Sequence, residues 1–257
     1  MNFLAAVGRV FLNFLAATGR LSLFTGSASA GSVAPPFYLR LILRQMLDVG
    51  YYSLPVVGLT ATFTGMVLAL QSYTGFSRFE AEGAVATVVV LSMTRELGPV
   101  LAGLMVAGRV GAAMAAEIGT MRVTEQIDAL STLSTNPIKY LVAPRLIAGL
   151  TMLPLLVVVA DIIGVFGGFL VSTYKLGFNP AAYLTSTFDH LERIDVVSGL
   201  VKSAVFGFII ALMGCYNGYH SKGGAQGVGG ATTQAVVSAS ILILCSDYFL
   251  TEMFFSK

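Results

Sequence analysis

Two adjacent charged residues, Arg95 and Glu96, stand inside an apolar stretch that runs from about residue 83 to residue 116. With about 1.5 Å of rise per helical residue, Arg95 lies about 18 Å from the start of that stretch, close to the middle of a membrane. Charges at this depth are costly and normally face a bundle interior or a water-filled cavity. Neighbouring helical residues point about 100° apart, so these two cannot simply pair with each other. By depth, Asp161 and Lys202 are the candidate partners in a buried charge network.

This charge pattern has two interpretations. The charges either form the polar part of a transport path or make a structural ion-pair network that holds a helix bundle together. Catalytic chemistry is not indicated, because the sequence shows no nucleophile paired with a base. The glycine-rich segment 223–230 lacks the Lys-Ser/Thr ending of a phosphate-binding loop, and no Walker motif occurs elsewhere.

The cysteines and histidines do not suggest a metal site. Cys215 and Cys245 sit in separate apolar runs, and His190 and His220 are far apart. We therefore predict no catalytic residue, no metal and no cofactor in this chain. If the protein's function depends on ATP, we expect a partner chain to bind the ATP.

The composition matches a chain dissolved in lipid. Hydrophobic residues make up 56% of the 257 residues and charged residues only 11%, whereas soluble domains carry about 25% charged residues. The net charge of +2 gives no indication of nucleic-acid binding. The sequence predicts an all-α integral membrane protein.

Five apolar stretches are long enough to cross a bilayer, which takes about 20 residues. They lie at about 51–73, 83–116, 146–174, 196–216 and 231–255.

Two helices are expected before the first span. Residues 1–24 read as an amphipathic helix with a cationic polar stripe, which is typical of helices lying in the membrane interface. After a small-residue linker at 26–31, an elbow helix begins at Pro35-Pro36 and runs to about Asp48. We expect residues 1–48 to form the interfacial and elbow helices, and residues 49–257 the five-span domain.

The distribution of positive charge predicts the orientation. With the N-terminus inside, the inner segments carry eight Lys and Arg residues and the outer segments carry four. Because inner loops are enriched in Lys and Arg, we predict an N-terminus inside and, after five spans, a C-terminus outside.

An amphipathic segment, residues 117–136, lies on the predicted inner side between the second and third spans. Val123, Ile127 and Leu130 mark one face, and Asn136-Pro137 is expected to end the helix. From periodicity alone, this helix either docks a partner subunit or connects two spans along the interface.

Several motifs resemble the signature of the MlaE permease family, membrane subunits of bacterial lipid-transport systems that work with mammalian-cell-entry (MCE) proteins. The resemblance covers nearly all of the chain beyond the N-terminal helix. It is carried by Arg95–Leu104, Ala107–Arg109 and Ala116–Leu130, with support from Gly65–Gln71, Asn136-Pro137, Pro144-Arg145, Leu153–Leu156, Lys202–Gly207 and Gly227–Thr233.

This resemblance implies a set of partners and a cargo. It implies a homodimer that binds two ABC ATPase subunits, a hexameric MCE-domain protein on the outer face and, in many systems, a small STAS-domain protein. It implies phospholipid as cargo, the bacterial inner membrane as location, and a part in maintaining the lipid asymmetry of the outer membrane.

The resemblance also implies two sites. The lipid cavity would lie between the two permease copies, with these candidates in this chain: Leu68, Gln71, Tyr73, Phe76, Phe79, Arg95 and Glu96. The aromatic residues among them have an alternative role as interface anchors. A cytoplasmic coupling helix at about 117–135 would contact the ATPase, with these candidates: Glu117, Gly119, Thr120, Met121, Arg122, Glu125, Gln126 and Ile127.

Two other classes of function are compatible with a polytopic chain. A stand-alone secondary transporter would use Arg95, Glu96, Asp161 and Lys202 as an ion relay. An intramembrane enzyme would need a nucleophile and base that the sequence lacks. The sequence therefore favours the permease subunit of an ABC system.

Overall fold

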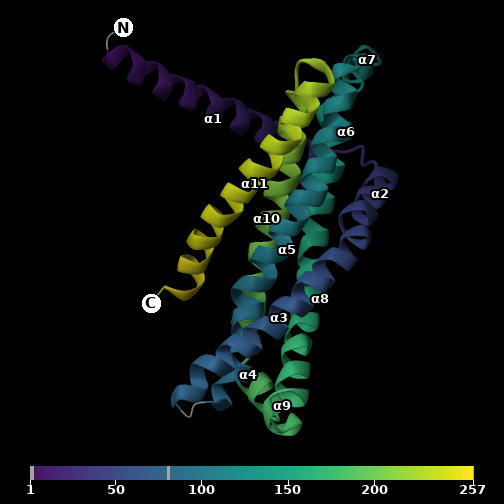
Figure 1. Cartoon of the computed structure of the whole chain (residues 1–257). Helices are drawn as coiled ribbons and strands as arrows, with labels where there is room; N and C mark the ends of the chain where they lie inside the picture. The colour runs from purple at the N-terminus through teal and green to yellow at the C-terminus, as the bar shows by residue number, and fades with distance from the viewer. Residues whose placement is uncertain (1–2, 80–81, 257) are drawn as a thin grey trace.

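Long helices running between two opposite ends dominate the structure (Figure 1). The computed structural model describes residues 3–79 and 82–256. Within these ranges it describes the side chains of all residues except 3–7, 9, 10, 14, 79 and 82. Within this part of the chain every regular element is helical. In order they are α1 (Phe3–Val33), α2 (Leu39–Val49), η1 (Tyr51–Ser53), α3 (Leu54–Phe76), η2 (Ser77–Phe79), η3 (Glu82–Ala84), α4 (Val85–Ser92), η4 (Met93–Leu97), α5 (Gly98–Val106), η5 (Ala107–Gly111), α6 (Ala112–Val123), α7 (Gln126–Thr132), η6 (Ile138–Val142), α8 (Ala143–Tyr174), α9 (Pro180–Asp189), α10 (Arg193–Tyr219) and α11 (Gly224–Phe255).

Five helical runs in the described residues are long and apolar enough to cross a membrane, which confirms the predicted number of spans. They are Leu39–Phe76, Val85–Val123, Ile138–Tyr174, Arg193–Tyr219 and Gly224–Phe255. Their outward sides carry bare apolar side chains such as Leu59, Phe63 and Phe249, each more than half exposed. Surfaces of this kind are stable in lipid or against other membrane helices.

The N-terminal helix is longer than predicted. Residues 26–31, expected to form a linker, continue α1 as far as Val33. Small residues there allow close packing: Ala28 is fully buried, and Gly31 lies against Lys139. Phe24 packs edge-on against Tyr216 of α10 at 5.4 Å. The linker prediction was therefore wrong, because these small residues form a docking surface within a helix.

Glycines bring the first, third and fourth spans into close contact. Gly65 of α3 lies directly against the backbone of Gly164 in α8, and Gly149 of α8 faces Gly207 of α10 in the same way. A Cβ at Gly65, Gly149 or Gly207 would overlap a backbone carbonyl, and one at Gly164 would overlap the side chain of Met93. Small residues of this kind allow membrane helices to approach closely, and α8 becomes the central helix of the bundle.

The second span is broken by two wide turns. Its helix consists of α4, α5 and α6, separated by the π-helical segments η4 and η5. In η4 the N–H of Gly98 donates to the carbonyl of Met93, five residues back, and Pro99 follows directly. Because proline has no N–H, the regular helical ladder cannot pass this point unchanged. Single π turns of this kind are often found at functional sites.

The predicted coupling helix is two helices. The end of the second span, α6, continues to Val123, and a separate short helix, α7, runs from Gln126 to Thr132. Glu125 lies between them in a left-handed conformation with φ of 60°. The single amphipathic helix expected across residues 117–136 was therefore wrong.

Asn136-Pro137 has a different part from the one predicted. The side-chain oxygen of Asn136 accepts a hydrogen bond from the N–H of Ile138 at 3.0 Å, so Asn136 caps the start of the third span. That span consequently begins at Ile138, about eight residues earlier than predicted.

Candidate functional site

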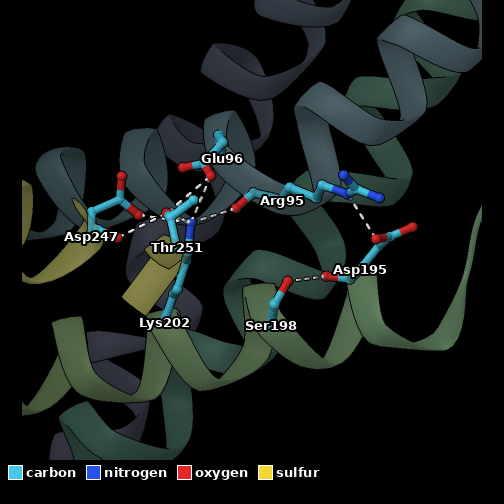
Figure 2. Close-up of polar contacts among 7 residues, drawn as sticks. All are labelled: Arg95, Glu96, Asp195, Ser198, Lys202, Asp247 and Thr251. Atoms are coloured by element: carbon cyan, nitrogen blue, oxygen red, sulfur yellow. Dashed lines mark hydrogen bonds and ion pairs between the residues drawn. The ribbon is translucent and has the colours of Figure 1, made fainter. Parts of the chain in front are cut away.

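A cluster of charges lies where the second, fourth and fifth spans meet (Figure 2). At its centre is Lys202 of α10, whose side chain has no exposed surface. Its ammonium Nζ lies 2.8 Å from Glu96 Oε1 and 3.0 Å from Asp247 Oδ1. It also donates to Thr251 Oγ1 at 2.7 Å and to the carbonyl oxygen of Arg95 at 3.0 Å. A buried ammonium is stable only when it is paired and hydrogen-bonded in this manner.

The break in the second span explains why Lys202 reaches the backbone at this point. In a regular helix the Arg95 carbonyl would accept from the N–H of residue 99, which is a proline. Lys202 supplies the missing donor. The ammonium therefore stabilises the distorted turn and fixes Glu96 and Asp247 at the same time.

A second ion pair extends the cluster. Arg95 Nε donates to Asp195 Oδ1 at 2.7 Å, and the Asp195 side chain is fully buried. The other oxygen of Asp195 accepts from the N–H of Glu192 at 3.0 Å, completing a capping box at the start of α10. The Arg95 guanidinium also lies 4.5 Å from the ring centre of Phe255, near the end of α11. Arg95 thus joins three spans while a third of its side chain stays exposed.

Of the four residues predicted to form the charge network, Glu96 and Lys202 form an ion pair with each other. Asp161 does not join them: its Oδ1 is buried without a hydrogen-bond partner and lies against Gly98. The structure instead supplies two other carboxylates, Asp195 and Asp247. Asp161 was predicted from its depth in the membrane alone. Asp195 was missed because the fourth span was predicted to begin at residue 196, which left Asp195 outside it.

A sequence signal for both missed carboxylates exists. Asp247 and Thr251 are four residues apart in the fifth span and therefore share a helix face. Glu192 and Asp195 have the spacing of a reciprocal helix cap, which places the start of the fourth span at residue 193.

The predicted lipid-cavity residues fall into two groups. Leu68, Tyr73 and Phe76 are partly buried against the core of the chain, with the Tyr73 ring 5.8 Å from Phe178. Gln71 is exposed on α3, and Arg95 and Glu96 keep 33% and 38% of their side chains exposed. The side chain of Phe79 lies outside the described side chains.

A groove of about 490 Å³ lies elsewhere, between α8, α9, the second span and the start of α10. Its wall is almost entirely apolar, with Phe166, Leu184 and Val196 among the lining residues. Tyr183 is a buried lining residue, and burial raises the pKa of its phenol, an effect that the Ser172 hydroxyl partly offsets. Among the predicted cavity residues whose side chains are described, none lines this groove.

The predicted coupling residues divide into exposed and packed positions. Thr120, Glu125 and Gln126 are exposed. Ile127 is 1% exposed and Gly119 is buried, so these two shape the segment and do not present a surface. Met121 packs partly against the core.

Two ion pairs hold the ends of this segment. Arg122 reaches Asp128 of α7 at 2.7 Å across the break. Glu117 pairs with Arg145 of α8 at 2.6 Å, and Arg145 is nearly fully buried while Glu117 is more than half exposed. The segment is thereby tied to the second and third spans.

The described residues hold no group of three or more His, Cys, Asp and Glu side chains arranged for a metal ion. What the structure offers is five spans, a fixed charge cluster within them and an exposed segment at one end. These features define a polytopic α-helical membrane protein.

The chain belongs to the MlaE permease family. The family described as Permease MlaE matches residues 42–253, from the elbow helix α2 to near the end of α11. This confirms the family indicated by the sequence motifs.

Relatives of this chain carry compatible names. A probable ABC transporter permease protein of Rickettsia felis is 64% identical over 99% of this chain and 98% of its own length. The intermembrane phospholipid transport system permease protein MlaE of Haemophilus influenzae is 34% identical over 99% of this chain and 98% of its own length. The chloroplastic protein TRIGALACTOSYLDIACYLGLYCEROL 1 of Arabidopsis thaliana is 40% identical over 84% of this chain and 62% of its own length. The chain is thus an ABC transporter permease of the MlaE type.

Proposed function

We propose that this chain is the membrane subunit of an ABC transporter that moves phospholipid between the inner membrane and a periplasmic MCE-domain protein, a transport that helps to maintain outer-membrane lipid asymmetry. The observation that carries the proposal is the charge cluster in the family's signature segment, where Arg95 and Glu96 are fixed by Asp195 and Lys202 and yet remain partly exposed. A charged side chain that is held in place within the membrane and is partly exposed is suited to contact a lipid headgroup. The relative from Haemophilus influenzae, named for phospholipid transport, supports this cargo.

In the proposed complex, two copies pair so that their polar faces enclose the lipid. Gln71, Arg95 and Glu96 would contact the headgroup, and Leu68, Tyr73, Phe76 and Phe79 would lie near the acyl chains. Two ABC ATPase subunits would bind at the α7 end and an MCE hexamer would cap the α9 end, with a STAS-domain protein as a further subunit. The N-terminus would then be cytoplasmic, in accord with the charge distribution of the sequence.

The coupling mechanism would be mechanical. The ATPase would push on the exposed side of the segment around Glu125. The pair between Glu117 and Arg145 would pass that movement to α8, the helix at the centre of the bundle. A stand-alone secondary transporter is less well supported, because the relatives are named as ABC permeases.

Replacing Arg95 by methionine tests the headgroup contact. We expect ATP-driven phospholipid transfer to fall about ten-fold, which corresponds to a lost charge-assisted contact of about 1.4 kcal/mol. The measurement is transfer of a labelled phospholipid in proteoliposomes that contain the complete complex. Because Arg95 also pairs with Asp195, the matched control is Asp195→Asn, which weakens that ion pair and leaves Arg95 in place. If both variants transfer lipid at the same reduced rate, Arg95 acts only through the ion pair and the headgroup contact is wrong.

Replacing Glu125 by lysine tests the ATPase contact. We expect this charge reversal to reduce co-purification of the ATPase, because Glu125 is exposed at the break between α6 and α7. Glu125→Gly is the companion variant. It removes the carboxylate while relieving a left-handed conformation that costs a non-glycine residue about 1–2 kcal/mol.

The two Glu125 variants together separate contact from folding. Both should bind less ATPase, although Glu125→Gly should raise the thermal stability of the permease. Charge reversal at Arg193, an exposed residue at the opposite end of the bundle, should leave the ATPase bound. Normal ATPase recovery with Glu125→Lys would refute the assignment of this segment.

A further inference from the structure

We propose that the apolar groove between α8, α9 and α10 is a second lipid site, which retains one acyl chain of a phospholipid from the leaflet on the α9 side of the membrane. This site is separate from the charge cluster and from the cavity proposed between two permease copies. It goes beyond the proposed function, because it requires neither ATP nor a particular direction of transport.

The dimensions of the groove fit one leaflet. Its wall on α8 extends from Val158 to Phe169, about 16 Å along the helix axis. Half of a hydrocarbon core of about 30 Å is about 15 Å. The volume of about 490 Å³ falls within the usual range of ligand pockets, about 300–1,000 Å³. The groove therefore has the length of a single acyl chain that enters from the α9 side.

The wall of the groove favours an acyl chain over an anionic headgroup. Two of the wall's three hydroxyl groups donate within their own helices: Thr94 to the Val90 carbonyl at 2.8 Å, and Thr187 to the Tyr183 carbonyl at 2.9 Å. The third, the Tyr183 hydroxyl, is buried and has no hydrogen-bond partner among the described residues. Asp161, at the inner end, has its buried oxygen turned against Gly98. None of the described residues that line the groove carries a positive charge that could neutralise a phosphate. The groove is thus suited to the apolar part of a lipid and not to its phosphate.

The groove also differs from the ordinary lipid-facing surface. An acyl chain in it would be contacted on several sides, by Phe166 of α8, Leu184 of α9 and Val196 of α10. In lipid, where no water is displaced, such closer packing is what distinguishes a retained chain from the surrounding ones. By contrast, Phe63 stands on the outer face of α3 and is not among the groove residues.

The chain contains no tryptophan, so a single introduced tryptophan reports on one position. Phe166→Trp places the reporter in the groove and Phe63→Trp places it on α3; the native side chains are 55% and 61% exposed. Each full-length variant is reconstituted in vesicles of dibrominated phosphatidylcholine, whose bromine atoms quench tryptophan on contact. The vesicles are then dissolved in a large excess of detergent without bromine.

We expect the Phe166→Trp variant to stay quenched in detergent, while the Phe63→Trp variant regains its fluorescence. Adding Val196→Phe to Phe166→Trp narrows the groove from the α10 side and should release the quenching. The proposal is overturned if both reporters recover alike, or if Val196→Phe leaves the quenching unchanged. It is also overturned if Phe166→Trp is not quenched in the vesicles, because another protein segment then covers the groove. The lipid-transport proposal is unaffected by these outcomes, since no transport is measured.

Discussion

Replacing Lys202 by methionine should lower the free energy of unfolding by about 3–5 kcal/mol, the usual cost of leaving one side of a buried ion pair without its partner. The ammonium is fully buried and lies within 3.0 Å of carboxylate oxygens of both Glu96 and Asp247. Without it, two carboxylates face each other in the membrane, and the Arg95 carbonyl loses its donor. The measurement is thermal unfolding of the purified permease in mild detergent.

Neutralising the partners should recover much of this loss. In the triple variant Glu96→Gln, Lys202→Met, Asp247→Asn, no uncompensated charge remains around position 202. The matched control for the lysine itself is Lys222→Met, an exposed position where the effect should stay within about 0.5 kcal/mol. A Lys202→Met protein as stable as the parent would show that the cluster does not hold the bundle together.

The triple variant also decides between the two interpretations of the buried charges. If it is stable and transfers phospholipid normally, Glu96, Lys202 and Asp247 form a structural network only. If it is stable and inactive, these charges take part in transport. Thermal stability and transfer must therefore be measured on the same preparation.

Replacing Gly65 by alanine should destabilise the protein by about 1–3 kcal/mol, the usual cost of forcing an extra carbon into a packed contact. The new Cβ would overlap the carbonyl oxygen of Gly164, which is backbone and cannot rotate away. The spans α3 and α8 would have to separate, although their contact is the most extensive in the bundle. The measurement is again thermal unfolding in detergent.

Gly58→Ala on the same helix is the control. A Cβ at this position would lie 3.7 Å from Ile163 Cδ1, an ordinary contact. Both substitutions gain the same helix propensity, about 1 kcal/mol. Their difference therefore isolates the close approach at Gly65. Equal stability of the two variants would contradict the packing of α3 on α8 described here.

Span number and family could be predicted from the sequence because both depend on local signals. The length of an apolar run determines whether it crosses a membrane, and the three segments of the family signature lie close together in the chain, between Arg95 and Leu130. The lipid-cavity and coupling roles remain predictions, which the experiments proposed above are designed to test.

Helix ends and charge partners could not be predicted as well, because they depend on tertiary contacts. Residues 26–31 resemble a linker until Phe24 and Ala28 are seen to dock on the bundle. The break at Glu125 depends on one residue in a left-handed conformation. The carboxylate of Asp195 both caps the start of α10 and pairs with Arg95. Depth in the membrane alone does not reveal such a double role.

The most direct test of the central claim is to purify this chain gently from its native membrane, without overexpressed partners, and to identify by mass spectrometry what accompanies it. We predict an ABC ATPase in stoichiometric amount, an MCE-domain protein and bound phospholipid. A chain that purifies alone, stays folded and carries no lipid would contradict the account and favour a stand-alone secondary transporter.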